Sequence, residues 1–168
     1  MKKRKVTVLS APGGKPAGTL VQVGGMLFSS SISGVDSKTG RLSTQASEQI
    51  DAAFANLKAL LGMAGATADE IGLVTICLGD ERDSRQVDRA WAALYPDERN
   101  RPARKINEYS LPPGERVQLQ IVGEKATIAL EVFGQRVVSR SPAGARISPG
   151  RGSCGSRCSA TGARPQRQ

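Results

Sequence analysis

The stretch EQIDAAFANLKALLGMAGATADEIGLVTICLGD, residues 48–80, carries the signals that determine the fold class. Apolar residues recur in its first half at spacings of three and four, which places them on one face of a helix. These residues are Ile50, Ala53, Phe54, Leu57, Leu60 and Leu61. Gly65 is well placed to end the helix, and the β-branched run after it is typical of a strand. We therefore predict a helix over residues 45–63 and a strand over residues 71–78.

Strand-like segments precede this helix and also follow it. Residues 6–9 are β-branched, and residues 20–23 and 26–29 flank Gly24-Gly25, a dipeptide that favours a tight hairpin. The elements predicted beyond residue 80 are a second amphipathic helix over 83–95 and two strands over 102–109 and 115–122.

The order of these elements predicts an α+β protein in which two helices cover one face of a mixed sheet. The second face of the sheet also needs cover, and aromatic residues make up only 4% of the chain. We therefore expect homo-oligomerisation to bury that face.

The formal net charge of +9 is concentrated at the two ends of the chain. Residues 2–5 contribute four positive charges, and residues 127–168 contain seven arginines and one acid. Residues 6–126 hold 13 Lys/Arg against 14 Asp/Glu, a balance of −1. This body gives no electrostatic reason to expect a nucleic acid as partner.

Composition divides the chain into three parts. Residues 1–126 form the predicted folded domain, and residues 127–138 still alternate, which predicts either an extension of the last strand or an added edge strand. Residues 139–168 are rich in Ser, Gly, Pro, Ala and Arg and contain almost no large apolar side chains. Such a segment cannot bury enough surface to offset its ordering entropy, so we predict a disordered tail that is not needed for folding or activity.

The residue types that are missing exclude several classes of function. The chain has no histidine, which excludes Ser-His-Asp triads and other mechanisms built on an imidazole base. Cys77 lies in an apolar run and is predicted to be a buried thiol, while Cys154 and Cys158 lack partners for a zinc site, so no metal is expected. No apolar run approaches the roughly 18 residues of a membrane span, and no apolar segment follows the basic N-terminus. We expect a cytoplasmic protein.

Residues 100–120, NRPARKINEYSLPPGERVQLQ, hold the best candidates for a binding site. Pro102 favours extended backbone in the residue before it, and the strand that follows holds Arg104 rigidly, as suits bidentate capture of a carboxylate. An ordinary surface arginine is the alternative. Gln118 and Gln120 alternate with apolar residues and are predicted to face away from the core. Ordinary solvent-exposed strand residues show the same pattern, which is the alternative to a binding role.

Five segments resemble, in the same order, the RidA/YjgF family of reactive-intermediate (imine/enamine) deaminases. They are MLFSSSISGVDSKTGRL (26–42), EQIDAAFANLKALLGMAGATADEIGLVTICLGD (48–80), RAWAALYP (89–96), RPAR (101–104) and LPPGERVQLQIVGEKA (111–126). The similarity covers residues 6–126 without large gaps. It implies a chorismate-mutase-like α+β fold assembled as a homotrimer, with ligand clefts between subunits and no cofactor.

The resemblance also implies a reaction. The family arginine, matched by Arg104, holds the carboxylate of a 2-iminoalkanoate or of 2-aminoacrylate. A positioned water then attacks the C=N carbon and gives the 2-oxo acid and ammonia. The other positions implied to line the substrate cleft are Ala17, Ser30, Ser31, Asp88 and Ile106, with Gln118 at the position of the water-positioning residue.

Several of these positions depart from the family pattern. Ala17 replaces a tyrosine, Asp88 replaces an asparagine, Ser31 replaces a glycine, and Gln118 replaces the water-positioning glutamate. Because a glutamine cannot accept a proton near neutral pH, general-base help from position 118 is lost. We predict a deaminase with a shifted substrate, or alternatively a non-catalytic trimer that binds small carboxylates. A nucleic-acid function, suggested by the family's ties to RNA cleavage, is opposed by the near-neutral body and the lack of histidine.

Overall fold

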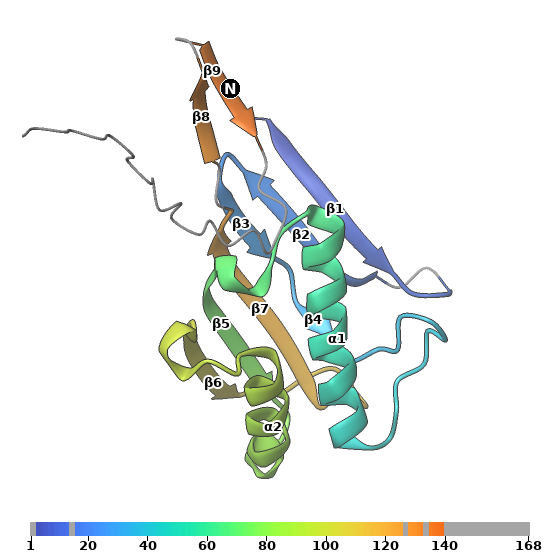
Figure 1. The fold of residues 1–168 in the computed structure, drawn as a ribbon. Coiled ribbons are helices and arrows are strands. Elements are labelled where there is room, and N and C mark those ends of the chain that lie inside the picture. The colour runs from blue at the N-terminus through green and yellow to red at the C-terminus, as the bar shows by residue number, and fades with distance from the viewer. Residues whose placement is uncertain (1–2, 14–15, 126–127, 133–134, 140–168) are drawn as a thin grey trace, which may run out of the picture.

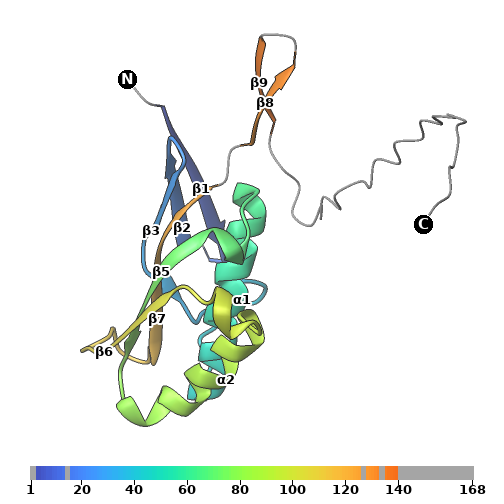
Figure 2. The same ribbon diagram turned by 60° about the vertical axis from the view of Figure 1, so that its left-hand side comes forward.

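In the part of the chain that the structure describes, two helices lie against one face of a mixed seven-stranded sheet (Figures 1 and 2). The computed structural model describes residues 3–13, 16–125, 128–132 and 135–139. The sheet strands are β1 (Arg4–Ser10), β2 (Pro16–Val23), β3 (Met26–Ser29), β4 (Ile32–Ser33), β5 (Ile71–Leu78), β6 (Ala103–Glu108) and β7 (Val117–Glu124), and the helices are α1 (Ala46–Ala64) and α2 (Ser84–Leu94). The predicted α+β class, with both helices on one face, is confirmed.

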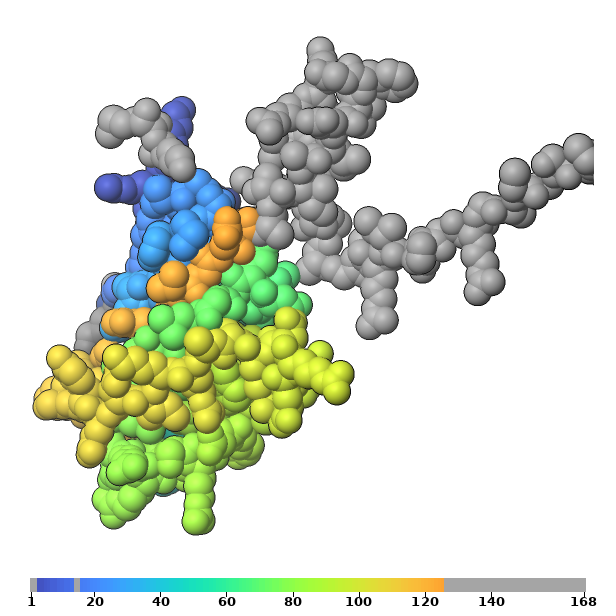
Figure 3. Space-filling model, turned by 90° about the vertical axis from the view of Figure 1, so that its left-hand side faces the viewer, coloured from blue at the N-terminus to red at the C-terminus, as the bar shows by residue number. Residues whose placement is uncertain are grey.

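The strands are ordered β1-β2-β3-β7-β5-β6, and β4 pairs with β7 beside this path. β5 and β6 are parallel, whereas the other neighbouring pairs are antiparallel. Part of the order is visible as neighbouring bands in the space-filling view, from blue β3 through orange β7 and green β5 to yellow β6 (Figure 3). β6 is therefore a free edge of the sheet in a single chain.

Helix α1 ends where the sequence predicts. Gly65 takes a left-handed conformation with φ of 65°, and its N–H caps the last turn of the helix. This conformation strains residues with a Cβ, so glycine is the residue expected here. The apolar side chains of α1 are buried against the sheet, with Ile50, Leu57 and Leu60 fully inaccessible.

The core lies between the helices and the central strands. Alternate residues of β5 and β7 are buried on the helix side, because side chains of a strand point to opposite faces in turn. These core residues are Val74, Ile76 and Leu78 of β5 and Val117, Leu119 and Ile121 of β7. Gln118 and Gln120 lie between them and point to the other face, as predicted.

The face away from the helices carries a row of apolar residues that crosses five strands, which we call the apolar row. Cα register joins its members directly across β1, β2, β3, β7 and β5. They are Val6, Val21, Phe28, Val122 and Leu73. Val6 is 58% exposed and Phe28 is 42% exposed in the single chain. The expectation that this face needs additional cover agrees with these exposures.

Three details differ from the sequence predictions. β4 was not predicted, and Cys77 is half-buried on the open face instead of buried in the core. Residues 128–132 and 135–139 form strands β8 (Ile128–Val132) and β9 (Gln135–Ser139), which pair with each other and neither extend β7 nor join the edge of the large sheet. Cys154, Cys158 and most of the predicted tail lie outside the described residues.

None of the helices among the described residues is long and apolar enough to cross a membrane. No group of three or more His, Cys, Asp or Glu side chains in these ranges has an arrangement that would hold a metal ion.

Candidate functional site

Arg104 lies on the edge strand β6 and projects to the helix side of the sheet. Its Cα partner in the parallel strand β5 is Val74, whose side chain is buried beneath the helices. There the guanidinium meets α2: Arg104 Nη1 donates to Asp88 Oδ1 at 2.7 Å, and the Arg104 Cζ lies 5.1 Å from the ring centroid of Trp91. The arginine is thus held from one side by a carboxylate and against an aromatic ring.

This contact leaves part of the guanidinium available. Arg104 Nε and Nη2 make no hydrogen bond to other residues that the structure describes, and the side chain remains 30% exposed. A hollow of about 470 Å³ borders it, lined also by Glu98, Arg101 and Pro102. A planar guanidinium with free N–H groups in a fixed position suits binding of a carboxylate.

The segment before Arg104 is fixed by its own hydrogen bonds. Arg101 is extended, with φ of −76° and ψ of 136°, as expected for a residue before Pro102. Its Nε donates to the Tyr95 carbonyl at 3.0 Å, and its Nη1 pairs with Glu98 Oε1 at 3.1 Å. The two arginines therefore differ, because Arg101 is engaged in holding the loop.

Ile106 is on the same side of β6 but borders a different hollow. Its Cα partner is Ile76, and it is 38% exposed. The hollow beside it measures about 390 Å³ and is lined by Glu81, Ser84 and Glu108. In a single chain Ile106 therefore does not share a pocket with Arg104.

The open face carries a polar cluster at one end of β7. Gln120 Nε2 donates to Ser31 Oγ at 3.1 Å, and Gln118 lies opposite Cys77 of β5 and Ser33 of β4. Gln118 Nε2 donates to Glu115 Oε2 at 2.7 Å, and both side chains are half-buried. A carboxylate therefore stands next to the amide that occupies position 118.

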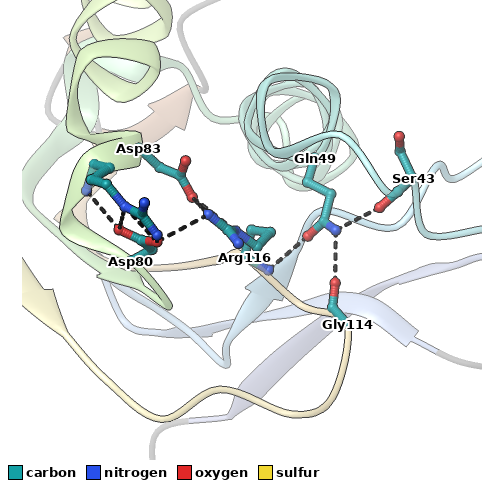
Figure 4. A network of polar contacts seen from close by, with 7 residues as sticks. Ser43, Gln49, Asp80, Asp83, Gly114 and Arg116 are labelled. Atoms are coloured by element: carbon teal, nitrogen blue, oxygen red, sulfur yellow. Dashed lines mark hydrogen bonds and ion pairs between the residues drawn. The ribbon is translucent and has the colours of Figure 1, made fainter.

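The turn that carries Glu115 is tied to helix α1 through Gln49, which is 1% exposed (Figure 4). Gln49 Nε2 donates to the carbonyls of Ser43 at 2.6 Å and Gly114 at 2.8 Å. Gln49 Oε1 accepts from the Arg116 N–H at 2.8 Å. One buried side chain thus satisfies three backbone groups and fixes both neighbours of Glu115.

The side chain of Arg116 turns the other way and anchors the same turn to the start of α2. Its Nε and Nη2 donate to Asp83 Oδ2 at 2.9 and 2.7 Å, and Nη2 lies 3.6 Å from Asp80 Oδ2 (Figure 4). Hydrogen bonds from the Arg82 side chain, helped by its backbone N–H, lower the pKa of Asp80 to about 2. Asp80 is therefore ionised at neutral pH and adds to this anchor.

Two predicted site residues have local structural contacts. Ser30 is exposed, and its Oγ accepts from the Thr19 N–H at 3.0 Å, which joins β2 to the end of β3. Ala17 is only 1% exposed in the single chain. A third hollow, of about 400 Å³, lies between the 34–43 loop and α1 and contains none of the predicted site residues.

The predicted residues thus fall into two groups on opposite faces of the sheet. Arg104 and Asp88 are together on the helix side, while Ser31 and Gln118 share the open face. Sequence reasoning missed Glu115, although a charged residue three positions before Gln118, just after a Leu-Pro-Pro-Gly turn, was a visible signal. Trp91, whose ring lies against the Arg104 guanidinium, is likewise absent from the predicted site residues.

Comparison with known proteins gives consistent matches. The family model described as Endoribonuclease L-PSP matches residues 15–124. A RutC family protein of Aquifex aeolicus (strain VF5) is 31% identical over 111 residues, which are 66% of this chain and 89% of that protein. The structure of YyfA, a conserved Rid-family protein from Yersinia pestis, has a TM-score of 0.61 at 26% identity and covers 71% of this chain and 99% of its own. RidA from the Antarctic bacterium Psychrobacter sp. PAMC 21119 has a TM-score of 0.60 at 24% identity, over 70% of this chain and 93% of its own.

Proposed function

This chain belongs to the endoribonuclease L-PSP family, the family of the RidA and YjgF proteins, and we propose that it hydrolyses reactive 2-imino and enamine acids to 2-oxo acids and ammonia. The observation that carries the proposal is the Arg104 guanidinium, which Asp88 and Trp91 fix beside a hollow. Its Nε and Nη2 make no hydrogen bond to the residues that the structure describes. These groups would bind the substrate carboxylate and orient the imine carbon.

The chemistry asks mainly for orientation and proton management. Water adds to the C=N carbon, the π electrons move to nitrogen, and nitrogen takes up a proton. The hydroxyl proton of the resulting carbinolamine then moves to the amino nitrogen, the C=O bond forms and ammonia leaves. Because an imine is already electrophilic, fixing it beside a water accounts for much of the rate gain, and no covalent nucleophile is required.

The site requires a second copy of the chain. Arg104 projects to the helix side of β6 and Gln118 to the open face, so the sheet separates them within one chain. An assembly that sets the β6 edge of one subunit beside the open face of the next joins the two groups in one cleft. We propose the homotrimer that the family resemblance implies, with its clefts between subunits.

The proposal is tested with the full chain and 2-iminobutanoate generated enzymatically in the assay. Ammonia release should exceed the spontaneous rate, and Arg104→Ala should lower kcat/KM by about 100-fold or more, the loss of a charge-assisted bidentate contact. Arg89→Ala, which removes an exposed arginine of α2 paired with Asp51, is the matched control and should keep the wild-type rate.

The same experiment separates catalysis from binding alone. A non-catalytic carboxylate-binding trimer is favoured by Gln118, which cannot accept a proton. That function would show as 2-oxobutanoate binding that Arg104→Ala abolishes, with no ammonia release above background. Ammonia release that persists in Arg104→Ala would contradict the binding-only function and the role that we propose for Arg104 in the reaction.

A further inference from the structure

We infer that Glu115 is the proton acceptor for the attacking water, in partnership with Gln118. The inference rests on the proposed function and adds a catalytic residue to it. Glu115 Oε2 already accepts from Gln118 Nε2 at 2.7 Å, so the carboxylate and the amide form one unit on the open face. Glu115, three residues earlier in the chain, thereby provides the carboxylate that is missing at position 118.

Other carboxylates of the described residues are poorly suited to this task. Asp88 is on the helix side and is paired with Arg104. Glu124 is on the open face, but it lies at the far end of β7, opposite Met26. Glu115 is the carboxylate that contacts the polar cluster, and no cation among the described residues pairs with it.

The position of Glu115 is fixed on both sides. Gly114 takes φ of 86°, which lets the chain turn sharply, and the Glu115 N–H donates to the Pro112 carbonyl at 3.0 Å. On the other side the Arg116 backbone is bound to Gln49 and its guanidinium to Asp83. A carboxylate placed on a turn held this firmly is preorganised, as catalytic groups need to be.

The remaining acceptor atoms of the pair match what a water requires. Among the described residues, Glu115 Oε1 and Gln118 Oε1 make no hydrogen bond. Each therefore accepts one hydrogen of the same water, which aims its lone pair away from the pair. As the new C–O bond forms, Glu115 takes the proton and the C=N electrons move to nitrogen. Glu115 then returns the proton to that nitrogen, which gives the carbinolamine. In a second transfer Glu115 takes the proton of the new hydroxyl and delivers it to the amino nitrogen, and ammonia leaves as the C=O bond forms.

The test compares Glu115→Gln, Gln118→Glu and their combination with the wild type by ammonia release at neutral pH. Glu115→Gln should lower kcat by about 10²- to 10⁴-fold, the usual contribution of a general base, with KM and 2-oxobutanoate binding unchanged. Glu115→Gln with Gln118→Glu exchanges the carboxylate and the amide within the pair and should restore at least tenfold of the loss. Glu124→Gln, at the other end of the strand that holds Gln118, is the control and should behave as wild type.

The outcomes separate this inference from the proposed function. If the wild type is active and Arg104→Ala is not, while a folded Glu115→Gln keeps the wild-type kcat, only the inference is overturned. If the wild type releases no ammonia above background, the proposed function fails and takes the inference with it. Circular dichroism of each variant shows whether it is folded. If Glu115→Gln alone does not fold, the double variant that exchanges the two residues still tests the inference.

Discussion

The hydroxyl of Tyr95 is buried, and it has no hydrogen-bond partner among the residues that the structure describes. Burial, with a smaller effect of the Asp69 charge, raises the pKa of Tyr95 well above its ordinary value of 10. Since the pKa in the folded state lies above that in the unfolded chain, ionisation of this group leaves stability at its full value below pH 10. Stability falls as the pH rises beyond 10, because the unfolded chain then gives up the proton more readily than the folded one.

Tyr95→Phe should therefore change stability in two ways. It removes an unsatisfied buried hydroxyl, so the free energy of unfolding at pH 7 should rise by about 1 kcal/mol. It should also flatten the loss of stability above pH 10. Urea unfolding at pH 7 to 11 measures both effects, with Tyr109→Phe as control because Tyr109 is 66% exposed. A Tyr95→Phe curve that parallels wild type above pH 10 would rule out this account.

The directions of the two key side chains differ in how far the sequence reveals them. Gln118 alternates with buried Val117 and Leu119, so its outward direction follows from the period of a strand. β6 is an edge strand whose residues are mostly exposed, so its pattern contains no alternation to orient Arg104. Its direction depends on pairing with Val74, a tertiary contact. The Glu115 contact is likewise set by the turn geometry.

Gln49 links α1 to the turn before β7, and its loss should be costly. Gln49→Leu keeps the side-chain bulk but leaves the Ser43 and Gly114 carbonyls and the Arg116 N–H without their partner. We expect the free energy of unfolding to fall by about 3 kcal/mol, since unsatisfied backbone groups are expensive when buried. Gln45→Leu, at the exposed N-cap, makes the same chemical change and should shift the urea midpoint little.

A fall in stability as small as that of the Gln45 control would show that water replaces these bonds at no cost. The rate of ammonia release by Gln49→Leu, measured under conditions in which the variant is folded, gives a second test. We expect this rate to fall, because a displaced turn also moves Glu115.

Elements with local signals were predicted closely, and those that depend on a distant partner were not. The helix end at Gly65 and the strand Ile71–Leu78 agree with the predictions because a glycine and a β-branched run act within a few residues. β4 is two residues long, and it exists because Ile32 pairs with Leu119 of β7. Residues 128–132 and 135–139 form β8 and β9, which pair with each other. Sequence alternation alone does not identify the partner of a strand.

The whole molecule presents two features that a second subunit would explain together. The apolar row crosses the sheet on the face that no helix covers, and large exposed apolar patches commonly mark interaction sites. The two groups of predicted site residues lie on opposite faces, so the cleft that we propose needs residues from two chains. The sequence predicted that a second subunit buries this face of the sheet. How the subunits are arranged depends on the shape of the assembled sheet, which residue patterns do not reveal.

We expect the wild type to behave in solution as a particle of three times the 17.7 kDa of one chain, measured by size-exclusion chromatography with light scattering. Phe28→Glu places a charge in the apolar row and should shift the protein to the monomer mass, because burying an unpaired carboxylate costs several kcal/mol. Met63→Glu makes the same change at an apolar side chain of α1 that is 55% exposed and should leave the mass unchanged. Ammonia release should disappear in Phe28→Glu along with the trimer, since the cleft requires two subunits. A monomeric wild type that still releases ammonia would show that Arg104 acts without a neighbouring subunit, and the proposed cleft would have to be abandoned.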